Sequence, residues 1–170
     1  MSDLIQLVYA SRATFKPAPN SQGVEPSVAR ILMQSRRNNS RVDIGGVLYF
    51  GDGYFFQVLE GDRTVVTETY ERITSDPRHS DATILSLKNT RERGFNEWSM
   101  KYVPVDDAVR AFLAKRGERN FAPFKFSGGD VEALVRLLHA QGEGGATKAK
   151  RKWDLGGLLR APALLNPFRR

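Results

Sequence analysis

The sequence predicts an α+β fold, in which a sheet carries two helices on one face and further helices follow toward the C-terminal end. Three features lead to this prediction. Short apolar segments with strand character are interrupted by segments whose apolar residues have helical spacing. A glycine-rich turn joins two of the strand segments directly. The segments follow the order strand, helix, strand, strand, helix, strand, strand.

The first strand is predicted over Leu4–Ala10, where the alternation of side chains gives one face the residues Ile5, Leu7 and Tyr9. A loop over residues 11–25 leads to Pro26, which suits the first turn of a helix. One face of this helix is formed by Val28, Ile31, Leu32 and Ser35. The polar stretch Arg36–Asp43 is expected to end the helix.

A hairpin is predicted next, with strands over Gly46–Phe50 and Tyr54–Glu60 around the turn Gly51-Asp52-Gly53. One face of the second strand carries Phe55, Gln57 and Leu59. Asp62 is a suitable N-cap for a helix that extends to about Ser75. The buried face of this helix is expected to include Val66, Tyr70 and Ile73.

Two more strands are predicted over Ala82–Lys88 and Glu97–Val103, and the last has one face with Trp98, Met100 and Tyr102. The first six elements match the ferredoxin-like βαββαβ pattern, and right-handed crossovers place both helices on the same face. Helices are expected at 106–116 and 129–140, followed by a flexible joint at Gly142–Gly145.

The chain is expected to have three parts: a folded domain over 1–104, capping helices over 105–141 and a flexible basic tail over 142–170. The formal charge is +7, and residues 147–170 carry +6 of it. There is no cysteine, which excludes disulfides, thiolate metal sites and cysteine nucleophiles. Because the start lacks a secretory pattern and no apolar run approaches the ~20 residues of a membrane span, a cytoplasmic protein is expected.

Two polar residues share faces with apolar ones: Tyr9 on the first strand and Gln57 on the third. A buried amide without a partner costs about 1–3 kcal/mol, so it must be hydrogen bonded. In one interpretation, Tyr9 and Gln57 satisfy each other or the backbone. In the other, the amide links the phenol to a polar ligand between the helices.

The ends of the two predicted helices offer what such a ligand needs. Asn38, Asn39, Arg72 and Asp76 supply hydrogen-bond donors and acceptors, and Ile31 and Ile73 supply apolar walls. Each residue alone has an ordinary structural explanation as a cap, a surface ion pair or a core side chain. Together they predict a slot for a planar heterocycle with a polar edge.

Five stretches, in order over about residues 4–103, resemble the BLUF family, the sensors of blue light using FAD. They are Leu7-Val8-Tyr9-Ala10-Ser11-Arg12, Ser35-Arg36-Arg37-Asn38-Asn39, Gln57-Val58-Leu59-Glu60-Gly61, Tyr70-Glu71-Arg72-Ile73 with Asp76-Pro77-Arg78-His79, and Trp98-Ser99-Met100. The resemblance implies a blue-light photoreceptor that binds FAD non-covalently, with FMN as an alternative.

The resemblance also implies roles for individual residues. Tyr9 would donate an electron and a proton, Gln57 would change its hydrogen bonds, and Trp98 and Met100 would relay the change outward. Flavin contacts would come from Ile31, Ser35, Asn38, Asn39, Gln57, Arg72, Ile73 and Asp76. The signal would pass to a separate partner protein, and self-association is left open.

Two other functions stay open from the residues. A flavin-binding redox protein is one, although His79 and His139 lack metal-pair spacing and Glu60 and Asp62 are expected to be solvated or capping residues beside a turn. A module that contacts a membrane or nucleic acid through the basic tail 148–170 is the other. The chain is expected to have neither enzyme activity nor a metal site.

Overall fold

The computed structural model describes residues 3–16, 24–95, 99–103 and 107–154, and it describes side chains as far as Gln141. The remaining residues, which include Trp98 and the chain after Asp154, lie outside the described part.

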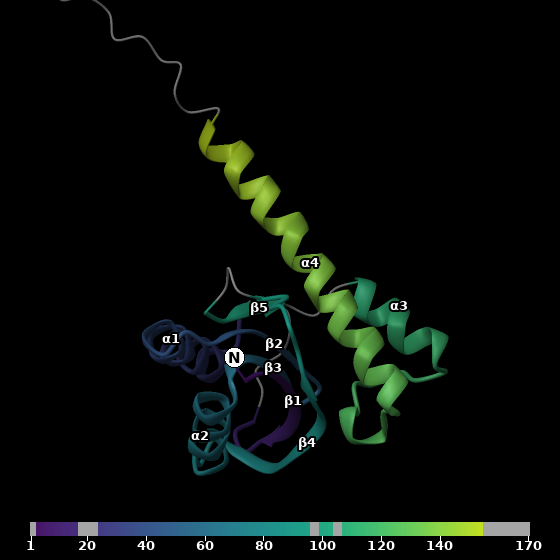
Figure 1. Ribbon diagram of the computed structural model, residues 1–170. Coiled ribbons are helices and arrows are strands. Elements are labelled where there is room, and N and C mark those ends of the chain that lie inside the picture. The colour runs from purple at the N-terminus through teal and green to yellow at the C-terminus, as the bar shows by residue number, and fades with distance from the viewer. Residues whose placement is uncertain (1–2, 17–23, 96–98, 104–106, 155–170) are drawn as a thin grey trace, which may run out of the picture.

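Five strands form one sheet, in the order β4-β1-β3-β2-β5 (Figure 1). Their bounds are β1 Leu4–Ala13, β2 Gly45–Gly51, β3 Tyr54–Asp62, β4 His79–Asn89 and β5 Lys101–Val103. The first four pair antiparallel, and β5 pairs parallel with β2 at the edge. This arrangement confirms the predicted ferredoxin-like sheet with one added strand.

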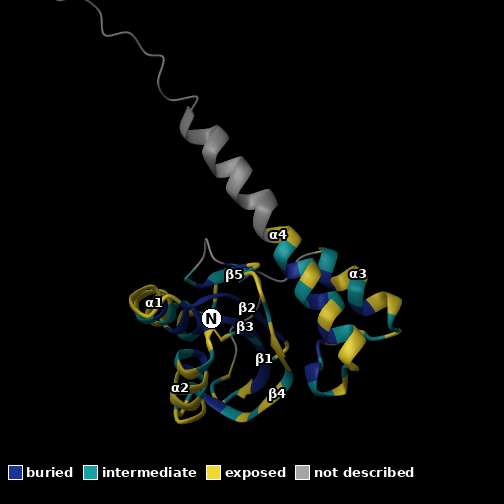
Figure 2. Ribbon diagram, viewed as in Figure 1, coloured by how far each residue is buried: buried dark blue, intermediate teal, exposed yellow. Residues whose placement is uncertain are grey.

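Helices cover both faces of the sheet. On one face lie α1 Pro26–Arg41 and α2 Arg63–Thr74, and on the other lie α3 Asp107–Lys115 and α4 Gly128–Asp154, with a short 3₁₀ turn, η2, at Pro123–Lys125 (Figure 1). Each face has its own apolar core, so β2 and β3 in the middle of the sheet are buried along almost their whole length, while the edge strand β4 is largely exposed (Figure 2). The predicted placement of the first two helices on one face is confirmed.

The helix starts follow from the capping residues. Pro26 opens α1, and the Glu25 side chain accepts a hydrogen bond of 2.9 Å from the Val28 amide. Asp62 caps α2 as predicted, by accepting a bond of 3.0 Å from the Thr64 amide. α1 ends at Arg41, inside the polar stretch Arg36–Asp43 that was expected to end it. There its polar side chains bond to backbone beside β5, as described below.

The last predicted strand and the last predicted helix need correction. Of the expected strand Glu97–Val103, only Lys101–Val103 forms β5 among the described residues. The joint expected at Gly142–Gly145 is wrong, because α4 runs through it to Asp154. Each glycine costs about 1 kcal/mol relative to alanine in a helix, which is too little to break one anchored by packed turns upstream. The division of the chain into three parts stays a prediction.

Candidate functional site

Tyr9 and Gln57 lie directly opposite each other on β1 and β3. Both side chains are buried, and the Tyr9 hydroxyl donates a short hydrogen bond to Gln57 Oε1. The other end of the amide, Nε2, donates to Met100 Sδ at 3.3 Å. The Gln57 amide therefore connects a phenol on one side to a thioether on the other.

Burial keeps the Tyr9 phenol in its neutral form. Loss of contact with water raises the pKa of Tyr9 far above its usual value, and the nearby Tyr70 and Asp76 raise it further. The rings of Tyr9 and Tyr70 are 5.3 Å apart and meet edge to face. Tyr9 is thus fixed as a hydrogen-bond donor whose proton points at the Gln57 amide.

Two polar residues of α1 hold the backbone around Met100. Asn39 is 2% exposed and donates from Nδ2 to the Ser99 carbonyl at 2.9 Å. The Arg36 Nε donates to the Met100 carbonyl at 2.8 Å. These bonds explain why α1 extends through its polar stretch, and they place Met100 against Gln57.

A cavity of about 140 Å³ lies between the sheet, α1 and the end of α2. Tyr9 lines it together with all eight residues that the family resemblance assigned to the flavin: Ile31, Ser35, Asn38, Asn39, Gln57, Arg72, Ile73 and Asp76. Met100 is not among its lining residues, although it is buried and contacts Gln57. The structure therefore brings together residues from four elements that are far apart in the sequence.

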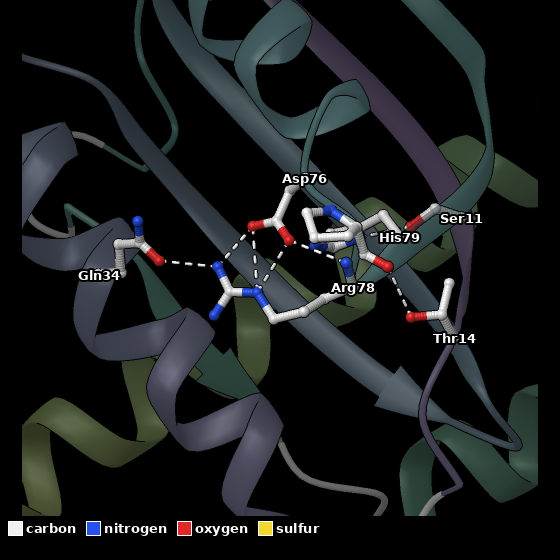
Figure 3. Close-up of polar contacts among 7 residues, drawn as sticks. Ser11, Thr14, Gln34, Asp76, Arg78 and His79 are labelled. Carbon is white, nitrogen blue, oxygen red and sulfur yellow. Dashed lines mark hydrogen bonds and ion pairs between the residues drawn. The ribbon is translucent and has the colours of Figure 1, made fainter.

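Arg78 also lines the cavity, although no role was predicted for it. Its guanidinium bonds to the Asp76 carboxylate, and its Nη2 donates to Gln34 Oε1 at 2.7 Å (Figure 3). Hydrogen bonds from Arg78 lower the pKa of Asp76 below its usual value. Arg72, one of the residues matched to the family, instead donates to Thr69 Oγ1 at 2.8 Å.

His79 is a second lining residue for which no role in the cavity was predicted. Its Nδ1 lies 2.8 Å from Ser11 Oγ, and its ring lies 4.4 Å from that of Phe55. Burial lowers the pKa of His79 to about 4, against the opposing effect of Asp76. Both Arg78 and His79 belong to the stretch Asp76-Pro77-Arg78-His79, which resembles the BLUF family. This resemblance was the only sequence signal that could have pointed to them.

The donor set suits a flat aromatic guest with a polar edge. Ile31 and Ile73 bring apolar walls from the two helices, and amide, guanidinium and carboxylate groups stand around the cavity. Within the described ranges, no group of three or more His, Asp or Glu side chains could hold a metal ion.

The family model described as "Sensors of blue-light using FAD", BLUF, matches residues 4–101. The chain belongs to the BLUF family. It is accordingly a flavin-binding domain that senses blue light, and the predicted photoreceptor function is confirmed over the redox and tail-binding alternatives.

Curated relatives carry the same domain in other settings. The photoactivated adenylate cyclase subunit beta of Euglena gracilis is 35% identical over 98 residues, which are 57% of this chain and 11% of that protein. The blue light- and temperature-regulated antirepressor BluF of Escherichia coli K12 is 31% identical over 93 residues, 52% of this chain and 23% of that protein. The chain thus spans about a tenth to a quarter of the length of these two relatives.

Solved structures match over more of the chain. The ground state of BlsA has a TM-score of 0.72 at 31% identity, covering 80% of this chain and 87% of that one. The dark state of BlrB, a BLUF protein, has a TM-score of 0.67 at 32% identity, covering 83% and 98%. The shared region therefore includes elements beyond the matched domain.

Proposed function

We propose that the chain holds FAD in the cavity between α1, α2 and the sheet, and that blue light changes the hydrogen bonds of Gln57. The observation that supports this proposal is the position of one amide, which lines the cavity and bonds to both Tyr9 and Met100. FMN has the same ring system as FAD and would fit the same walls.

The residues that would hold the flavin are the eight that line the cavity and match the family. Ile31 and Ile73 would pack against the ring, and Asn38 and Asn39 would bond to its polar edge. Arg72 and Asp76 would lie at the same end of the cavity as Arg78. A bound flavin supplies the absorption of blue light and, once excited, the capacity to accept an electron.

The chain's own contribution is a hydrogen-bond switch. The Tyr9 proton already points at Gln57 Oε1, so it can move to that oxygen without any rearrangement of the backbone. An amide has one donor end and one acceptor end, so rotation or tautomerisation reverses the pattern that it presents. Such a change at Gln57 also removes the donor that contacts Met100 Sδ.

The signal would then pass to a separate protein. The matched relatives are described as cyclase subunits and an antirepressor, and in each of them this domain is a minor part. Met100 and Trp98 are the proposed relay, and Trp98 lies outside the described residues. No helix among the described residues has the length and apolar character to cross a membrane. Contacts of the basic tail, self-association and a cytoplasmic location stay predictions.

The test is the absorption spectrum of the purified holoprotein before, during and after blue light. A flavin band that moves to longer wavelength and returns in the dark supports the proposal. Steady accumulation of reduced flavin, or turnover of an added electron acceptor, would instead support the redox alternative. Identification of the extracted flavin by chromatography decides between FAD and FMN.

A further inference from the structure

Glu60 is a buried carboxylate that the switch does not use. It lies on β3, three residues after Gln57, and the odd spacing turns it to the opposite face of the sheet, toward α4. Its exposed fraction is 1%, so the expectation of a solvated residue beside a turn is wrong. Burying a carboxylate is costly unless hydrogen bonds replace its water.

Two neutral donors replace that water. The Gln6 side-chain amide donates to Glu60 Oε1 at 2.6 Å, and the backbone amide of Phe95 donates to Oε2 at 2.9 Å. The first donor comes from the neighbouring strand β1, but the second comes from the segment between β4 and β5. Glu60 therefore fixes that segment to the strand that carries Gln57.

The same segment contacts α4. His139 Nε2 lies 2.7 Å from the Gly94 carbonyl, and the His139 and Phe95 rings meet edge to face at 5.2 Å. Gly94 lies between α4 and β3. A Cβ added at Gly94 would be 3.5 Å from His139 on α4 and 3.7 Å from the Glu60 carboxylate on β3. A cavity of about 420 Å³ adjoins this contact and is lined by Glu60, Gly94, Phe95 and His139 among others.

A second contact joins α4 to the other side of Met100. The Lys101 Nζ donates to the Gln141 carbonyl at 3.4 Å, one residue after the Met100 thioether that touches Gln57. Both contacts reach one turn of α4, at His139 and Gln141. Gly94 precedes Met100 in the chain and Lys101 follows it directly, so both contacts with α4 flank in sequence the residue that touches Gln57.

We propose that Glu60 is a positioning residue for the light signal: its carboxylate holds Gly94 and Phe95 against His139, so that the docking of α4 follows the state of Gln57. This inference rests on the proposed function. Without the carboxylate, the segment loses its hydrogen bond to β3. A hydrogen-bond change at Gln57 then lacks the connection through which it would alter the docking of α4.

The experiment uses the full chain loaded with flavin and a nitroxide on Ala140→Cys, an exposed position beside His139. The chain has no other cysteine, so the label is unique. Electron paramagnetic resonance spectra of the label are recorded in the dark and under blue light, in parallel with the flavin absorption. The expected result for the parent chain is a reversible change of label mobility that accompanies the red shift.

Glu60→Met has a side chain of similar length but no acceptor for Phe95. We expect it to keep the flavin and the red shift, while the light-induced change of the label falls by about fivefold or more. Glu60→Gln retains one acceptor oxygen for the Phe95 amide and should restore the response. Glu132→Met makes the same change at an exposed glutamate that lines the same cavity and should leave both signals intact.

An undiminished label response in Glu60→Met would overturn the proposal, and so would a parent chain that shifts its spectrum without any label response. If Glu60→Met does not fold, His139→Phe decides, because it keeps an aromatic ring near Phe95 but cannot bond to the Gly94 carbonyl. A label response there equal to that of the parent also overturns the inference. Failure of the proposed function is separate, since it appears as a missing red shift in the parent.

Discussion

Arg78 donates a hydrogen bond of 2.7 Å to Gln34, and this contact joins the start of β4 to α1 beside the cavity (Figure 3). The same guanidinium is held by Asp76, so it is fixed from both sides. Arg78 thus spans two of the elements that enclose the proposed flavin site.

The first prediction concerns flavin release. Arg78→Ala removes the link between α1 and the start of β4, and a hydrogen bond to a charged group contributes about 1.5–3 kcal/mol. We expect flavin to dissociate about tenfold faster, as measured by the recovery of flavin fluorescence after dilution. Arg110→Ala, on the exposed side of α3, is the matched control. Equal release rates in the two variants would contradict the assigned role.

The second prediction concerns the phenol. Tyr9→Phe should keep the yellow colour and lose the reversible red shift, because the proton that points at Gln57 is gone. The variant also leaves Gln57 Oε1 without its buried donor, which costs about 1–3 kcal/mol of unfolding free energy. Urea unfolding measures the second effect. Tyr54→Phe, whose hydroxyl bonds to Arg12 away from the cavity, should photocycle normally.

The third prediction concerns the amide. Gln57→Leu has a similar volume and no hydrogen-bonding groups, so it should bind flavin without a reversible shift. Gln34→Leu makes the same change at a lining residue that contacts Arg78 rather than Tyr9, and it should keep the shift. A normal photocycle in Gln57→Leu would refute the switch itself.

The fourth prediction concerns pH. The pKa of His79 is lowered to about 4 from 6.5, so the unfolded chain binds a proton between these values that the folded chain does not. Stability therefore falls as the pH drops from about 6.5 toward 4, and the loss at pH 5 relative to pH 7 is about 2 kcal/mol. Urea unfolding at the two pH values measures it. His79→Gln should lose about this much of the pH dependence, while the part due to Asp76 persists at lower pH.

The fifth prediction concerns packing between β2 and β3. A Cβ added at Gly46 would lie 2.1 Å from the Val58 carbonyl oxygen and 3.2 Å from Met100 Cε. Because the nearer atom is backbone, Gly46→Ala should destabilise the protein by about 3 kcal/mol or more. Gly128→Ala, where the added atom meets open space, is the control. Similar unfolding midpoints for the two variants would contradict this account.

Alternation alone was enough to predict which side chains share a face, and the faces of Tyr9 and Gln57 are confirmed. The register between their strands was not predictable from either segment, because a slip of one residue reverses every side chain. The pairing of Tyr9 with Gln57 depends on a ladder that runs from Leu4 to Arg12 along β3. Only the assembled sheet specifies it.

The positions of Arg78 and His79 at the cavity could not be predicted from the sequence, because they too depend on contacts between segments that are distant in the chain. The turn that carries them is held by two bonds from Thr14. Its hydroxyl donates to the Pro77 carbonyl (Figure 3), and its backbone amide donates to the Arg78 carbonyl. These bonds come from a residue more than sixty positions earlier in the chain. Glu60 was missed because its burial depends on α4, which packs on the second face of the sheet.

β3 separates two polar side chains: the amide of Gln57 faces the cavity beside α1 and α2, and the carboxylate of Glu60 faces the cavity beside α4. Gln57 and Glu60 are separated by an odd number of positions. Because successive side chains of a strand point to opposite faces, the two side chains lie on opposite faces of the sheet. An insertion or deletion of one residue between Gln57 and Glu60 would place the carboxylate on the same face as the cavity that is proposed to hold the flavin. The length of this short stretch is therefore as constrained as the identity of the residues at its ends.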